Sequence, residues 1–303
     1  FFKQKTPYEI LSGLVGSEMC IRDRNWIGKT QEIEDKLEVS PLNRMAATLN
    51  EQLREYSIGD KVPTLWHWLY FLESTPQSML ATDGHAKKGE FLPPITLPRR
   101  MWAGSRFSFK KSLKAGDKVI RISRIKDISV KQGKTGTLVF VNVAHEIKAN
   151  SGLAIIEEHD IVYRDNPNSS ATPPPVTKKS EIEPDFSEIF EPDPVLLFRY
   201  SALTFNGHRI HYDRDYVTHV EGYPGLIVHG PLLATLLIDR FQKNNMNLRI
   251  QSFEFKALHP VFDLNPFKIC STKVGDDNKA TLWIEDHQHN LCMRASVLTE
   301  VNK

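Results

Sequence analysis

Two parts of the chain alternate apolar and polar residues with a period of two, which is the pattern of half-buried β-strands. In the first part the alternation covers residues 106–110, 118–128, 137–147 and 153–163. In the second part it covers residues 250–258, 267–274, 280–285 and 290–298. Turn residues such as Asn150-Ser151-Gly152 separate the runs. Short connections of this kind favour antiparallel pairing, so we predict antiparallel sheets.

Apolar residues at helical spacing precede each group of strands. Residues 231–243 carry leucines on one face, and Pro231 suits the first helical position. A second helix is expected over residues 40–56, with Ser40 as its N-cap. Residues 64–72 are aromatic and apolar on nearly all sides and predict a buried segment. A helix followed by antiparallel strands, occurring twice, predicts an α+β fold in which each sheet wraps around a helix.

The order of these elements divides the chain into two similar halves. The tetrapeptide Phe107-Ser108-Phe109-Lys110 resembles Phe253-Glu254-Phe255-Lys256, which supports a duplicated architecture. We expect an N-terminal domain over residues 25–164 and a C-terminal domain over residues 195–303. Residues 165–194 are rich in proline, serine and glutamate and predict a linker that is partly extended. Residues 75–98 contain several prolines and glycines, which interrupt regular structure, so we expect this segment to be mostly loop.

The first 24 residues differ from the rest of the chain. Their apolar stretch is broken by Glu9, Ser12 and Gly16, which is unlike a signal peptide. The ending Met19-Cys20-Ile21-Arg22-Asp23-Arg24 resembles translated sequencing adapter. We therefore expect residues 1–24 to be a non-native leader and exclude them from the fold prediction.

Composition narrows the class of protein. The chain has 303 residues, 40% of them hydrophobic, and a formal net charge of +2, which does not favour nucleic-acid binding. Its 3 cysteines do not form a disulfide framework, so a reducing, cytoplasmic location is expected. Apolar runs stay well below the roughly 18 residues that a membrane span needs. The composition predicts a globular protein with no membrane or nucleic-acid partner.

Residues 198–236 hold the densest group of reactive side chains. This stretch contains four histidines: His208, His211, His219 and His229. Asn206 and His211 lie five positions apart, with Gly207 permitting a tight turn between them. An amide oxygen and an imidazole so placed could hold a water molecule, and neutral histidine is suited to removing its proton.

The same stretch leads into the predicted helix at Gly230. Backbone N–H groups at a helix N-terminus favour developing negative charge, so the Gly230 N–H could stabilise an enolate oxygen. A base, a water molecule and an oxyanion donor together suit reversible addition of water across a double bond that is conjugated to a carbonyl.

This stretch resembles the hydratase motif of MaoC-like, R-specific enoyl-CoA hydratases. That motif has an aspartate, one variable position, Asn-Pro, a branched apolar residue and a histidine. Here Ile210-His211 match, whereas Asn206 replaces the aspartate and His208-Arg209 replace Asn-Pro. Val228-His229-Gly230 resembles the segment that carries the backbone oxyanion donor of the family.

From about residue 25 the chain resembles the subgroup with two hot-dog domains, which includes mesaconyl-C4-CoA and itaconyl-CoA hydratases and 3-hydroxyacyl-thioester dehydratases. The phrases that carry this resemblance are LWHWLYFL, FLPPITLPRRMWAG, FRYSALTFNGHRIHYD and EGYPGLIVHGPLLATLL. It implies a double hot-dog fold. The N-terminal half has no equivalent of GHRIHYD, so we expect it to shape the pocket and carry no chemistry.

The resemblance implies roles for the catalytic positions. His211 would activate a water held by Asn206, and the Gly230 N–H would polarise the thioester carbonyl. Because an asparagine cannot exchange protons, a second proton-handling group is expected at His208 or Glu221. Neither a cofactor nor a metal is expected, since His208 and His211 lack further ligands at zinc spacing.

Several residues are candidates for binding substrate. Arg209 could bind a substrate carboxylate, or it could form a structural salt bridge. Arg99 and Arg100 could pair with the phosphates of coenzyme A, or they could lie on a solvated rim. His208 and His229 are expected beside the acyl group, although His229 could be a packed residue.

The leading functional prediction is reversible hydration of an enoyl-CoA thioester, with mesaconyl-C4-CoA as substrate and citramalyl-CoA as product. The acyl-CoA thioester is the expected partner, and a homodimer is possible. One alternative is a 3-hydroxyacyl-thioester dehydratase of fatty-acid synthesis, whose substrate is long and uncharged. The other is a non-catalytic acyl-CoA-binding subunit, which the loss of the usual acid at Asn206 leaves open.

Overall fold

The computed structural model describes residues 25–51, 55–133, 136–165 and 179–301. The predicted leader therefore lies outside the described residues, as do residues 166–178 of the predicted linker. No helix in these described ranges is long and apolar enough to cross a membrane.

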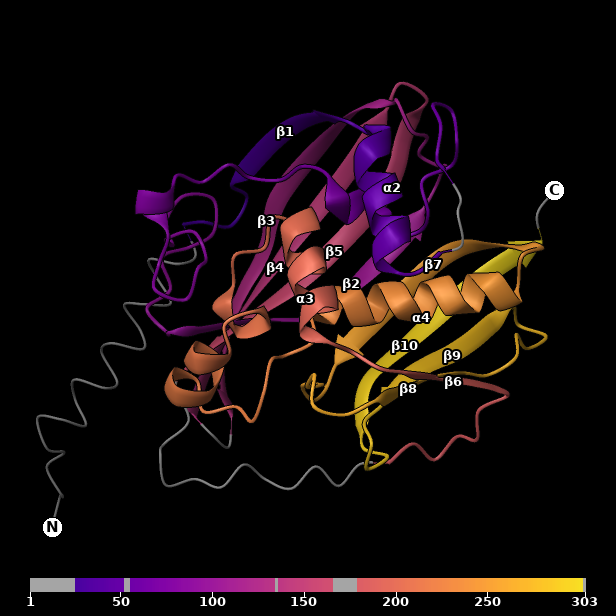
Figure 1. The fold of residues 1–303 in the computed structure, drawn as a ribbon. Coiled ribbons are helices and arrows are strands. Elements are labelled where there is room, and N and C mark those ends of the chain that lie inside the picture. Colours follow the sequence, from indigo (N-terminus) through magenta and orange to yellow (C-terminus); the bar gives the residue numbers. More distant parts are fainter. Residues whose placement is uncertain (1–24, 52–54, 134–135, 166–178, 302–303) are drawn as a thin grey trace, which may run out of the picture.

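Among the described residues, a single antiparallel sheet of ten strands forms the body of the fold (Figure 1). The strands are β1 (Thr30–Lys36), β2 (Arg99–Phe109), β3 (Lys118–Gly133), β4 (Gly136–Ala149), β5 (Gly152–Arg164), β6 (Phe186–Phe190), β7 (Leu248–Ala257), β8 (Phe267–Ser271), β9 (Lys279–Glu285) and β10 (Leu291–Val301). Their spatial order is β1-β3-β4-β5-β2-β7-β10-β9-β8-β6. The predicted antiparallel arrangement is confirmed, and the two groups of strands join into one sheet.

The strand order is symmetric about the pair β2–β7. Outward from this pair, the N-terminal half runs β2, β5, β4, β3, β1 and the C-terminal half runs β7, β10, β9, β8, β6. Each half therefore places its second strand at the join and its first strand at an outer edge. This matching topology supports the duplicated architecture that the repeated tetrapeptide suggested.

The repeated tetrapeptides meet at this join. Phe107 of β2 lies directly opposite Phe253 of β7, and their ring centroids are 6.1 Å apart. Gly104 of β2 permits the close approach of the strands, because a Cβ there would lie 2.3 Å from the carbonyl oxygen of Phe255. The two halves are thus connected through stacked phenylalanines and through a glycine that lets the strands approach closely.

In the part of the chain that the structure describes, three α-helices lie over the sheet: α2 (Val39–Thr48), α3 (Pro194–Leu203) and α4 (Gly230–Asn244). Figure 1 shows α4 crossing the C-terminal strands, α2 over the N-terminal strands, and α3 between them. The leucines of α4 are at most 3% exposed, and burying each stabilises the fold by about 2 kcal/mol. The α+β prediction, with a helix against the sheet in each half, is confirmed.

Two predicted boundaries are wrong. The first helix begins at Val39 with Glu38 as N-cap and ends at Thr48, so Ser40 lies inside it, and residues 49–51 and 55–56 do not continue it. The predicted linker contains strand β6, which pairs with β8 from Phe186↔Ser271 to Phe190↔Phe267. The polar residues around β6 hid this strand because it lies at the outer edge of the sheet, where little apolar surface is buried.

Candidate active site

The turn between α3 and the first site histidines is shaped by local hydrogen bonds. Asp193 caps α3, because its Oδ1 accepts from the backbone N–H of Val195 at 2.7 Å. After the helix, Phe205 has φ 50° and the chain reverses. Asn206 Oδ1 then accepts from the backbone N–H of His208 at 3.0 Å. Asn206 therefore holds the turn that positions His208, while its predicted role in orienting water stays a prediction.

His211 lies in a short 3-10 helix, η3 (Arg209–His211), and is 7% exposed. Its Nδ1 lies 2.7 Å from the carbonyl oxygen of Ile227, which can only accept a hydrogen bond. The proton is therefore on Nδ1, and Nε2 keeps a lone pair that can accept a proton. Burial lowers the pKa of His211 to about 4, so the ring is neutral near pH 7. These properties suit a general base.

The His229 ring packs against the ring of His211. The two rings are stacked with centroids 3.7 Å apart, and His229 Nε2 lies 2.8 Å from the Ser201 hydroxyl. His229 is 0% exposed, and burial lowers its pKa well below the usual value. The expectation that His229 contacts substrate is not supported by this position, because its ring is enclosed between Tyr200 and His211. His229 is instead a packed residue, which was the other interpretation of the sequence.

Gly230 is the first residue of α4, one residue earlier than the predicted helix. A Cβ placed on it would meet no atom within 4 Å, so open space lies beside the helix N-terminus. Pro231 follows and has no N–H, so the Gly230 amide is the donor next to this open space in the first turn. Its role as oxyanion donor stays a prediction that this geometry suits.

A loop of the N-terminal half docks onto this turn. Gly84 has φ +89°, and a Cβ on it would lie 1.9 Å from the carbonyl oxygen of Gly207. The backbone N–H of Arg209 donates to the carbonyl oxygen of Asp83 at 2.9 Å. Two glycines and this hydrogen bond fix residues 82–85 against the stretch that carries His208 and His211.

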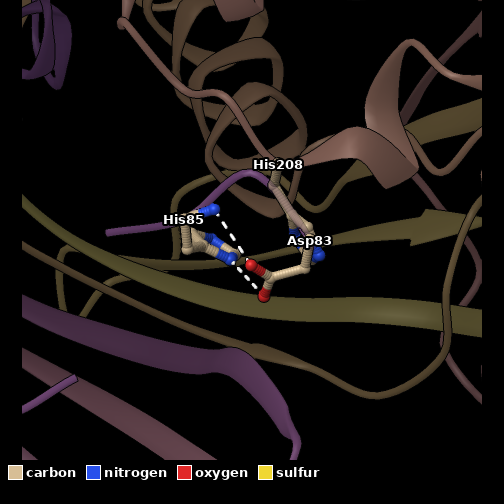
Figure 2. A group of neighbouring side chains, drawn as sticks. All are labelled: Asp83, His85 and His208. Atoms are coloured by element: carbon tan, nitrogen blue, oxygen red, sulfur yellow. Dashed lines mark hydrogen bonds and ion pairs between the residues drawn. The ribbon is translucent and has the colours of Figure 1, made fainter. Parts of the chain in front are cut away.

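The docked loop adds a carboxylate and an imidazole to the group formed by His208, His211 and His229. Asp83 accepts from the backbone N–H of His85 at 3.0 Å, and its second oxygen lies 3.0 Å from His85 Nδ1 (Figure 2). The His85 ring lies 4.1 Å from the His208 ring, and the His208 ring lies 5.5 Å from the His211 ring. Asp83, His85, His208 and His211 thus form a continuous row that crosses from one half to the other.

The row has a clear electrostatic pattern. Burial alone would raise the pKa of Asp83, but hydrogen bonds and charge from His85 hold that pKa below its usual range. Burial, and to a smaller extent the neighbouring His85 and His211, lowers the pKa of His208 to about 2. At neutral pH the row therefore contains one carboxylate among neutral imidazoles, which could stabilise a positive charge that forms on them.

Asp83 and His85 were not predicted from the sequence. The loop 75–98 has no periodicity, and residues 83 and 208 are far apart along the chain. The local signal was the tetrapeptide Thr82-Asp83-Gly84-His85, in which an aspartate, a glycine and a histidine form a polar turn. Their position argues against the expectation that the N-terminal half carries no chemistry.

The three predicted arginines have different surroundings. Arg209 donates to Asp213 Oδ2 from Nε at 2.9 Å and from Nη2 at 2.7 Å, so the structural salt bridge is the observed alternative. Arg99 Nη2 lies 3.1 Å from Glu221 Oε2, an ion pair that ties the two groups to each other. Arg100 lines a cavity in the N-terminal half. Binding of coenzyme A phosphates by Arg99 and Arg100 stays a prediction.

One group in the described part of the chain could hold a metal ion. The ligand atoms of Asp83, His85 and His208 all lie within 4.8 Å of one another. Both carboxylate oxygens of Asp83 already accept hydrogen bonds from His85, and tetrahedral zinc would need a further ligand such as water. The absence of a metal requirement stays a prediction that a chelator can test.

Comparison with known sequences assigns the chain to a protein family. The family described as hydroxyacyl-thioester dehydratase type 2 matches residues 65–263. The chain is 43% identical over 251 residues to mesaconyl-C4-CoA hydratase of Chloroflexus aurantiacus, covering 83% of this chain and 89% of that protein. It is 29% identical over 283 residues to the mitochondrial hydroxyacyl-thioester dehydratase type 2 of Schizosaccharomyces pombe, covering 84% of this chain and 92% of that protein.

Comparison with solved structures concerns the fold. A MaoC-like dehydratase from Phytophthora capsici matches with a TM-score of 0.65 at 13% identity, covering 91% of this chain and 96% of that one. A Mycobacterium tuberculosis protein described as a double hot-dog fold matches with a TM-score of 0.56 at 13% identity, covering 90% and 96%. The predicted double hot-dog fold is confirmed.

Proposed function

The chain belongs to the hydroxyacyl-thioester dehydratase type 2 family of MaoC-like hydro-lyases, and on this premise we propose that it hydrates mesaconyl-C4-CoA reversibly to citramalyl-CoA. One observation carries the proposal: a neutral histidine with an unprotonated Nε2, His211, lies in a row of imidazoles that ends at a carboxylate. The relative that is 43% identical supports the choice of acyl group.

The proposed reaction starts with proton removal from water. His211 Nε2 takes one proton while the water oxygen forms a bond to the β-carbon of the enoyl group. The electron pair of the double bond moves toward the thioester oxygen, where the Gly230 N–H stabilises the enolate. The imidazolium of His211 then gives its proton to the α-carbon. One water molecule is added, and the enzyme returns to its starting protonation state.

Asp83 supplies what Asn206 cannot. An imidazolium forms transiently within the row, and the negative charge of Asp83 stabilises it through His85 and His208. A carboxylate from the N-terminal half thereby replaces the one that the motif usually carries. A carboxylate at this place supports an enzyme over a non-catalytic binding subunit.

A panel of substrates tests the proposal. The purified protein is incubated with mesaconyl-C4-CoA, crotonyl-CoA and trans-2-decenoyl-CoA, and products are identified by mass spectrometry. We expect citramalyl-CoA, with kcat/KM for mesaconyl-C4-CoA at least about tenfold above that for the others. A parallel series with a chelator is expected to give the same rates.

The other outcomes separate the alternatives. Preference for the decenoyl thioester would identify a dehydratase of fatty-acid synthesis, which the Schizosaccharomyces pombe relative makes the second candidate. Binding of all the thioesters without turnover would identify a non-catalytic subunit. Loss of activity with the chelator would assign a metal to Asp83, His85 and His208.

A further inference from the structure

A cavity of about 220 Å³ lies in the N-terminal half, next to the row of site residues. We call it the cationic cavity and use six of its lining residues: Lys88, Arg100, Arg121, Ser123, His145 and His159. Its volume corresponds to about seven water molecules at roughly 30 Å³ each, which suits a short acyl group. The proposed reaction assigns no role to this cavity.

The floor of the cationic cavity is built from four neighbouring strands. Arg121 lies on β3, His145 on β4, His159 on β5 and Arg100 on β2, and these strands are adjacent in the order β3-β4-β5-β2. Ser123 of β3 is directly opposite His145 of β4. The strand period of two directs such residues to one face of the sheet. A rigid sheet therefore holds the polar groups in fixed positions.

Two buried polar atoms of this floor have no hydrogen-bond partner among the described residues. They are Nε of Arg121 and Nε2 of His145, and the His145 residue is 7% exposed. When the Ser123 hydroxyl donates to His145 Nδ1, 2.8 Å away, Nε2 carries the proton and is a free donor. Unpaired buried donors are costly, which indicates a ligand that accepts hydrogen bonds.

The charges that line the cavity favour an anion. Its cations are Lys87, Lys88, Arg100 and Arg121, and its carboxylates are Glu73 and Glu90. Glu73 Oε1 is 4.0 Å from Arg121 Nη2, too long for a hydrogen bond, and its side chain is 51% exposed. Lys88 is held in place, because its Nζ donates to the carbonyl oxygens of Ile95 and Leu97.

Arg100 connects the cavity to the catalytic row. Arg100 lies on β2 and lines the cavity. Ala86, which follows His85 directly, is part of the cavity wall. The cavity therefore adjoins the row, and it has apolar walls at Val143 and Ile161 for a methyl branch.

We propose that the cationic cavity binds the free carboxylate of a dicarboxylic acyl group, with Arg100 nearest the reacting carbons and Arg121 deeper in the cavity. This inference rests on the proposed hydration of an enoyl-CoA thioester and names the feature that selects the acyl group. Planar guanidinium groups match a carboxylate in a bidentate manner, and both arginines come from strands that fix their direction. Uncharged acyl groups gain nothing from these donors.

Binding of two unreactive thioesters tests the proposal without catalysis. Succinyl-CoA and butyryl-CoA have the same chain length and differ in the free carboxylate. We expect the wild-type protein to bind succinyl-CoA at least about tenfold more tightly in calorimetric titrations. Arg100→Gln and Arg121→Gln are each expected to reduce this preference by about tenfold, and Arg121→Gln is expected to leave the Kd of butyryl-CoA within about twofold.

Arg124→Gln is the matched control, because Arg124 lies on the same strand as Arg121 and its side chain is exposed. It is expected to leave both affinities unchanged. Equal affinity of the wild type for the two thioesters would overturn the proposal, as would an equal loss of both affinities in the Arg121→Gln variant. Failure of the proposed function is a separate result, since it shows as absent hydration in the substrate panel whichever thioester binds better.

Discussion

Replacing His211 with glutamine is expected to lower kcat for hydration by about 10²- to 10⁴-fold, the usual contribution of a general base. Glutamine can keep a hydrogen bond to the carbonyl oxygen of Ile227, which now accepts from Nδ1 of His211 at 2.7 Å. It cannot take a proton from water. KM is expected to change little, because the base acts on the transition state and not on substrate binding. Initial rates with mesaconyl-C4-CoA measure the effect.

His219→Gln provides the control for this substitution. His219 belongs to the same stretch but is exposed, and its Nδ1 lies 3.1 Å from the carbonyl oxygen of Asp215. The control is expected to retain the wild-type rate, and thermal melts should show both variants folded. Wild-type kcat in the His211 variant would remove this residue from the mechanism.

Replacing Asp83 with asparagine is expected to lower kcat by about 10²-fold, because it removes the charge that stabilises a nearby imidazolium. Asparagine can still accept from the backbone N–H of His85, so the turn that fixes the loop is preserved. The remaining site geometry depends on Gly84 and Gly207, which the substitution does not touch. Steady-state rates should therefore show a fall in kcat with little change in KM.

Asp117→Asn makes the same chemical change in a turn outside the site. The Asp117 carboxylate accepts from the backbone N–H of Lys114 at 2.9 Å, as Asp83 does from His85. This control is expected to keep full activity. An Asp83→Asn enzyme as active as the control would mean that the carboxylate shapes the loop and takes no part in the chemistry.

The strands that sequence periodicity missed are the two edges of the sheet. In β1 the sole aliphatic or aromatic residue is Ile33, and β6 spans residues 186–190 inside a stretch that reads as linker. Interior strands bury one face and so alternate clearly, whereas edge strands are often charged, which prevents association with other chains. The period-two pattern thus predicted the middle of the sheet well and its borders poorly.

The sequence predicted the residues of the row that come from the C-terminal half and gave little sign of those from the N-terminal half. His211 and Gly230 could be proposed because they lie within one short stretch and match a known motif. Asp83 reaches them through tertiary contacts, above all the contact between Gly84 and Gly207. A single sequence carries no signal of such a long-range contact. The asparagine at position 206 indicates that a proton-handling or charged group must come from elsewhere, and in the proposed mechanism Asp83 takes this place.

The central claim is that Asp83 of the N-terminal half and His211 of the C-terminal half act as one catalytic unit. The kcat of the double variant Asp83→Asn/His211→Gln, compared with both single variants, tests it most directly. Members of one unit are strongly non-additive, so the double variant is expected to keep kcat within about threefold of His211→Gln alone. A further loss of about 10²-fold, the full effect of Asp83→Asn added to that of His211→Gln, would contradict the claim.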